Sequence, residues 1–287
     1  MILFLTQISF PNVSFAEINV RDDTNQLVSL DHPARRIISL APNITELLFA
    51  AGAGDFVVGV VDFSDFPPAA KQIQNIGDHQ NYDMELILSL RPDLVVSWGS
   101  GSASEKIRKL KSLGLTVFVM EPRRFEDIAI NIEKLGRLAG SYKIARDASD
   151  HFGDTYKQLN KKYAGKKKLK VFFQIWNQPL MTINGQHLIS DVIRLCGGTN
   201  IFSELPSLAP SIDIEAVLAA NPDVIVVSGD EESRSKWVDD WYKWPNLKAV
   251  KNDHLFLVPA DLINRHTPRI LLGAQQMCEQ FESVRRK

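Results

Sequence analysis

Two glutamates, Glu85 and Glu215, occupy the same position in two segments that repeat along the chain. The segments NYDMELILSLRPDLVVSWG (81–99) and SIDIEAVLAANPDVIVVSG (211–229) align at a constant shift of 130 residues (211 − 81). In each predicted helix the apolar side chains form one stripe and the glutamate lies on the opposite face. Stabilisation of the helix dipole, about 0.3–1 kcal/mol, would explain an acidic first turn. The strict positional match favours a shared role, such as docking a two-fold partner that presents an arginine to each lobe.

Aromatic and charged side chains follow the ends of several predicted strands. They are Phe63, Phe66, Trp98, Trp176, Asp261, Arg265 and His266. Ligands of open α/β sheets bind beyond the carboxyl ends of the strands. A cleft with aromatic faces, an aspartate and an arginine suits a large, flat, partly polar ligand. Each aromatic could equally belong to the core of its own lobe.

The motifs of common enzyme classes are missing from the sequence. It has no phosphate-binding P-loop, no G-x-S-x-G nucleophile elbow and no H-E-x-x-H zinc helix. The six histidines have no tight ligand spacing, and we predict no metal site, although histidines distant in the sequence could still form one. With 33 basic and 34 acidic residues the net charge is −1, and we expect no nucleic-acid partner. An enzyme built on the same scaffold stays a minor alternative.

The elements that must position these residues alternate between strands and helices. Apolar runs predict strands at 36–40, 56–61, 94–98, 116–120, 170–175, 224–227 and 255–258, with helical spacing between them. The pattern predicts an α/β fold of two Rossmann-like lobes with parallel sheets, joined by one long helix. Asn43 followed by Glu46 resembles a capping box at the start of the first helix.

We place the domain boundaries from these patterns. Residues 1–16 are a predicted signal peptide, ending in Ser14 and Ala16 at the −3 and −1 positions, and 17–34 form an N-terminal extension. The N-terminal lobe spans 35–140, the linking helix 141–168 and the C-terminal lobe 169–287. Cys196 and Cys278 could form one disulfide or remain two buried thiols, and an exported chain favours the disulfide.

Several of these stretches resemble the cobalamin-binding proteins of bacterial ABC importers, the BtuF family. The shared markers are RIISLAPNITE (36–46), SDFPP (64–68), PDLV (92–95), LCGGTNIF (195–202) and TPR (267–269). The resemblance covers nearly all of residues 34–285. It implies a rigid linking helix, limited closure of the lobes, a periplasmic location and a receptor that carries out no chemistry.

The resemblance also implies roles for individual residues. Glu85 and Glu215 match docking glutamates that pair with arginines of a membrane permease dimer, and Cys196 and Cys278 match a disulfide. Phe63, Trp98 and the segment from Asp261 to Arg265 fall on ligand-contact positions. Cobalamin binders of the family tend to place tryptophans in loops that align with His79 and the Leu208–Ala209 region, and Trp176 could compensate.

The ligand expected from this resemblance is cobalamin or a related corrinoid. Haem, a ferric siderophore or another metal chelate is the alternative, in which His79 or His266 could approach the metal. We expect a monomer that has no cofactor of its own.

Overall fold

The computed structural model describes residues 17–78, 81–99, 103–229 and 231–286. Each lobe contains a four-stranded parallel sheet. In spatial order the N-terminal sheet is β4 (Val57–Val60), β3 (Ile37–Ser39), β5 (Leu94–Trp98) and β6 (Val117–Met120). The C-terminal sheet is β8 (Gly198–Asn200), β7 (Leu169–Gln174), β9 (Val224–Gly229) and β10 (Leu255–Pro259).

The two sheets share one topology. If the strands of each four-stranded sheet are counted along the chain, both sheets run second, first, third, fourth. The repeated segment supplies the third strand in both cases, β5 and β9, which are buried almost throughout. Strands covered on both faces are continuous apolar runs, as these are. The predicted duplication and the two-lobed α/β fold are confirmed.

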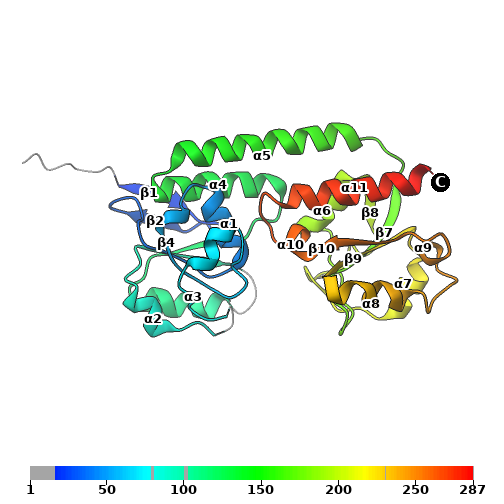
Figure 1. Ribbon diagram of the computed structural model, residues 1–287, viewed down its shortest axis with the longest axis horizontal. Coiled ribbons are helices and arrows are strands. Elements are labelled where there is room, and N and C mark those ends of the chain that lie inside the picture. The colour runs from blue at the N-terminus through cyan, green and yellow to red at the C-terminus, as the bar shows by residue number, and fades with distance from the viewer. Residues whose placement is uncertain (1–16, 79–80, 100–102, 230, 287) are drawn as a thin grey trace, which may run out of the picture.

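Helices cover the sheets of both lobes (Figure 1). Those of the N-terminal lobe are α1 (Pro42–Ala50), α2 (Met84–Ser89), α3 (Ala103–Ser112) and α4 (Phe125–Ala139), with short 3-10 turns η1 (Gly54–Phe56) and η2 (Pro68–Gln72). Those of the C-terminal lobe are α6 (Leu188–Leu195), α7 (Ile214–Ala220), α8 (Glu231–Trp241), α9 (Lys248–Lys251), α10 (Ala260–Ile263) and α11 (Ile270–Arg286). In the part of the chain that the structure describes, no helix is long and apolar enough to cross a membrane.

The linking helix is α5 (Tyr142–Tyr163), which runs along the top of Figure 1 above α4 and α11. It packs closely on α4, because a Cβ at Gly136 would lie 2.2 Å from the Cβ of Ala145. The rings of Phe125 and Tyr156, 4.7 Å apart, continue this contact. One helix therefore contacts elements of both lobes, as predicted, and it ends at Tyr163, five residues before the predicted end at 168.

The N-terminal extension is a hairpin of β1 (Ile18–Arg21) and β2 (Leu27–Leu30). Its turn is anchored to the N-terminal lobe, since Asp23 pairs with Lys134 at 2.7 Å. The backbone N–H of Asp23 also donates to the carbonyl of Val119 at 3.0 Å. The hairpin is therefore part of that lobe.

The capping box predicted at Asn43 is wrong. Helix α1 begins two residues earlier than that cap requires, at Pro42, with Ala41 as its N-cap and no side-chain cap. Proline is well suited to this position because the first helical N–H has no partner within the helix. Glu46 is consequently free of a capping role, and its side chain is almost fully buried.

The predicted disulfide is present between Cys196 and Cys278. It joins the end of α6 to the middle of α11 across 82 residues of chain, and both cysteines are fully buried. The disulfide therefore links α11, the last helix of the chain, covalently to α6 of the same lobe.

Candidate ligand-binding cleft

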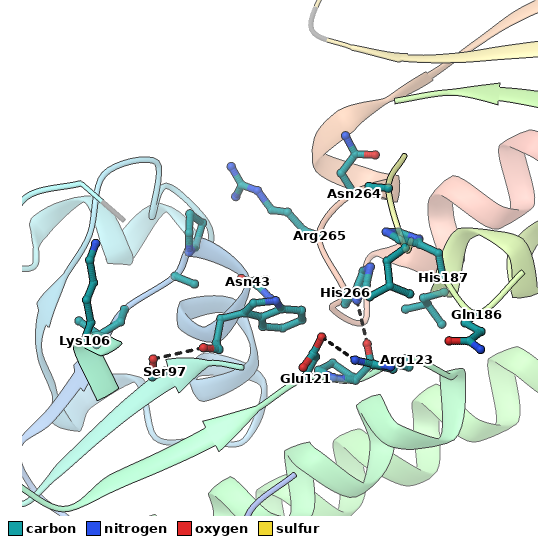
Figure 2. Close-up of a pocket in the computed structure, with 18 of the residues that line it drawn as sticks. Asn43, Ser97, Lys106, Glu121, Arg123, Gln186, His187, Asn264, Arg265 and His266 are labelled. Atoms are coloured by element: carbon teal, nitrogen blue, oxygen red, sulfur yellow. Dashed lines mark hydrogen bonds and ion pairs between the residues drawn. The ribbon is translucent and has the colours of Figure 1, made fainter. Parts of the chain in front are cut away.

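A cavity of about 600 Å³ lies between the lobes (Figure 2). The end of β5 and segments that follow β3 and β6 contribute to one wall, and segments from the C-terminal lobe form the other. The lining residues are Leu40, Ala41, Pro42, Asn43, Tyr82, Ser97, Trp98, Lys106, Glu121, Pro122, Arg123, Gln186, His187, Leu188, Leu208, Ala209, Asn264, Arg265 and His266. The cleft is thus at the strand ends, where the sequence predicts it.

Two of the predicted ligand contacts, Trp98 and Arg265, line this cavity. The indole of Trp98 lies edge-on to the imidazole of His266, with 5.6 Å between ring centres. Arg265 extends from the opposite lobe toward the cleft (Figure 2). Trp98 thus offers an aromatic surface on one wall, and Arg265 offers a cation on the other.

The other predicted contacts lie beyond the cavity lining. Phe63 is 77% exposed, in a left-handed backbone conformation with φ of 63°. Phe66 carries the guanidinium of Arg269 over its ring, 3.9 Å from the centroid. Trp176 is 54% exposed and packs edge-on against Trp237.

Asp261 likewise lies outside the lining, and its carboxylate pairs with Arg265 at 2.9 Å. His79 is outside the described residues. Phe63, Phe66, Trp176, Asp261 and His79 therefore remain predicted ligand contacts.

Two histidines that touch each other form part of the cleft wall. The rings of His187 and His266 are 5.2 Å apart and nearly perpendicular. His266 Nδ1 lies 2.8 Å from the carbonyl oxygen of Pro122 and so donates to it across the lobes. His187 Nδ1 accepts from the N–H of Ile189 at 3.2 Å. A neutral imidazole carries one N–H. His187, whose Nδ1 accepts, therefore has its proton on Nε2, whereas His266, whose Nδ1 donates, has a lone pair on Nε2.

Burial keeps both imidazoles neutral. Desolvation lowers the pKa of His266 to about 4, against the weaker opposing effect of its bond to Pro122. Desolvation, with a smaller contribution from His266, lowers the pKa of His187 to about 3. Sequence reasoning identified His266 from its place after a strand but missed His187, which no local pattern marks. Within the described ranges, no group of three or more His, Cys, Asp or Glu side chains could hold a metal ion.

Five charged side chains form an interlobe ion cluster at the edge of the cleft: Glu46, Asp65, Asp261, Arg265 and Arg269. Arg265 Nη1 lies 3.0 Å from Glu46 Oε1 and 2.7 Å from Asp65 Oδ1. Arg269 Nε donates to Glu46 Oε2 at 2.9 Å, and its Nη2 donates to Glu46 Oε1. Burial acts to raise the pKa of Asp65, but the hydrogen bond and charge of Arg265 outweigh it and hold that pKa below its ordinary value.

The repeated glutamates are exposed, as the sequence predicts. Glu85 lies in the first turn of α2 and Glu215 in the first turn of α7. Figure 1 shows both helices on the side of the lobes away from α5. The two carboxylates are thus available at matching positions of the two lobes, and their docking role remains a prediction.

Comparison with known proteins places this fold in a family. The family described as periplasmic binding protein matches residues 37–262. A vitamin B12-binding protein of Vibrio parahaemolyticus is 35% identical over 266 residues, which cover 92% of this chain and 95% of that protein.

Solved structures show the same architecture. The periplasmic vitamin B12 binding protein BtuF of Vibrio cholerae aligns with a TM-score of 0.82 and 35% identity, covering 89% of this chain and 99% of that one. The periplasmic heme-binding protein RhuT from Roseiflexus sp. RS-1 aligns with a TM-score of 0.76 at 21% identity, covering 88% and 99%, a likeness of fold alone. The family consists of binding proteins, in agreement with the missing enzyme motifs. The chain belongs to the periplasmic binding protein family.

Proposed function

We propose that this protein captures cobalamin or a related corrinoid in the interlobe cleft and delivers it to an ABC importer. The observation that carries the proposal is a 600 Å³ cleft between duplicated lobes, with Trp98 and the neutral histidine pair on its walls. The proposal is also supported by relatives, because vitamin B12-binding proteins are 35% identical to this chain over nearly its whole length.

The chemistry of the cleft suits a corrinoid. A corrin is a broad ring with amide groups around its edge, so it needs an apolar surface and both donors and acceptors. Trp98 supplies the surface, His187 Nε2 supplies a neutral donor, and His266 Nε2 supplies a neutral acceptor. Arg265 adds a cation for a carbonyl or phosphate oxygen.

The proposed partner is a permease dimer in the inner membrane, contacted from the periplasm. Glu85 and Glu215 would each pair with an arginine of one permease subunit, which fits their exposure and matched positions. The receptor itself would act as a monomer and change no bond in its ligand.

The test is a titration of the purified protein with cyanocobalamin, haem and a ferric siderophore, followed by absorbance and calorimetry. We expect cyanocobalamin to bind most tightly and Trp98→Ala to weaken it by at least about tenfold, since buried aromatic contacts dominate binding. Trp244→Ala is the matched control, because Trp244 is a partly exposed tryptophan away from the cavity. Preference for haem or siderophore would instead support the metal-chelate alternative.

A further inference from the structure

The interlobe ion cluster is built around a carboxylate that sequence patterns did not single out for function. Glu46 comes from α1 of the N-terminal lobe, and both of its arginine partners come from the C-terminal lobe. Its side chain is 2% exposed, whereas those of Arg265 and Arg269 are 13% and 18% exposed. A buried carboxylate is tolerated only where its oxygens are paired, and here each oxygen accepts from a guanidinium.

The partners of Arg265 differ in how strongly they are tied to the protein interior. Glu46 is buried, while the side chains of Asp65 and Asp261 are 43% and 56% exposed. Water or a ligand oxygen can displace the two exposed carboxylates from the guanidinium of Arg265 more easily than it can displace the buried one. A ligand oxygen could therefore replace Asp65 or Asp261 at the guanidinium without breaking the bond to Glu46.

Arg269 completes the cluster from the other side. It bonds both oxygens of Glu46, and its guanidinium stacks on Phe66 of the N-terminal lobe. A planar, forked cation bound in this bidentate way fixes orientation as well as distance. Glu46 and Phe66 thus hold Arg269 to the lobe that faces it.

We infer that Glu46 is a positioning residue of the cleft. It fixes the guanidinium of Arg265 at the edge of the ligand site, and with Arg269 it holds the two lobes at one separation before ligand arrives. The link to ligand affinity rests on the proposed function. The effect on lobe separation does not, because it is a property of the unliganded protein.

The experiment measures lobe separation directly by double electron–electron resonance between two spin labels. Ser89→Cys in α2 and Ala219→Cys in α7 are exposed, equivalent positions in the repeat (89 + 130 = 219). The native cysteines are closed in a buried disulfide and do not compete for label. Glu46→Gln is introduced into this pair, because it keeps the size of the side chain and removes its charge.

We expect Glu46→Gln to broaden the distance distribution of the unliganded protein. It should also weaken cyanocobalamin binding by about tenfold, mainly through faster dissociation, as loss of a buried charge partner does. Lys134→Met is the control: it removes one partner of a partly buried ion pair, with side chains 22% and 17% exposed, that lies within one lobe. This control should leave both the distribution and the affinity unchanged.

Each outcome bears on the inference. If Glu46→Gln fails to fold, Arg269→Lys, which removes the bidentate geometry but keeps the charge, replaces it in the same measurement. If the variant gives a distance distribution between the spin labels as narrow as that of the parent, the positioning role of Glu46 is overturned. A broadened distribution in a protein whose parent does not bind cyanocobalamin would support that role and overturn only the proposed ligand.

Discussion

At the scale of single residues, the neutral pair of His187 and His266 makes stability depend on pH. The pKa of His266 is about 4 in the folded protein and about 6.5 in an unfolded chain. Between these values the unfolded chain binds a proton that the folded protein does not, so stability falls as pH falls from about 6.5 to about 4. We expect His266 to contribute a loss of roughly 2 to 3 kcal/mol between pH 7 and pH 4.5.

Urea unfolding at the two pH values checks this prediction. The variant His266→Gln should show a smaller loss of unfolding free energy than the parent. His32→Gln, at an exposed histidine of the N-terminal lobe, is the control and should match the parent. An identical pH dependence in all three proteins would show that His266 does not remain neutral when folded.

Residue types alone predicted part of the cleft. Trp98 and Arg265 were found because both lie near the ends of parallel strands, where side chains of different strands meet. Glu46 was misread because its spacing from Asn43 matched a local capping motif, whereas its real partners are 219 and 223 residues away. Local spacing carries no information about such pairs, and the same limit explains why His187 was missed.

At the scale of elements, the disulfide between α6 and α11 should be a main source of stability for the C-terminal lobe. A disulfide that closes a loop of 82 residues reduces the entropy of the unfolded chain, and the loop-closure argument gives an upper value of roughly 4.5 kcal/mol. We expect Cys196→Ala with Cys278→Ala to lower the free energy of unfolding by about 2 to 4 kcal/mol. Alanine avoids leaving a buried polar group.

Denaturant unfolding of this double variant, and of the parent with and without reductant, measures the effect. The fully reduced parent should unfold at a lower urea concentration than the oxidised parent. Equal midpoints would mean that packing of α11 alone holds the lobe together, in contradiction to the prediction.

The order of elements was the most predictable feature of the fold. Apolar runs separated by helical periodicity gave the alternation of strands and helices, and the repeat required the same topology in both lobes. The β1–β2 hairpin was not predicted, because two four-residue strands are too short for a strong periodic signal. Its anchor, the pair of Asp23 with Lys134, depends on a contact across more than a hundred residues.

At the scale of the whole molecule, two features connect the lobes. Helix α5 contacts both lobes on one side of the molecule, and the interlobe ion cluster joins them beside the cleft. We expect a scaffold held at these two places to keep the distance between α2 and α7 nearly constant. Constant spacing is what a receptor needs if Glu85 and Glu215 are to engage two permease subunits at once, and it reduces the ordering cost of that contact.

The prediction at this scale is that the two glutamates act together in transport and have no part in ligand binding. Glu85→Ala and Glu215→Ala should each reduce uptake of radiolabelled cyanocobalamin by membranes containing the importer, and the double variant should abolish it. Two anchors on one rigid body act as a bivalent contact, so losing both costs more than losing either. Glu126→Ala is the matched control, since Glu126 is an exposed first-turn glutamate on α4. Normal uptake by the double variant, or weakened cyanocobalamin binding in calorimetry, would contradict this separation of ligand capture from docking.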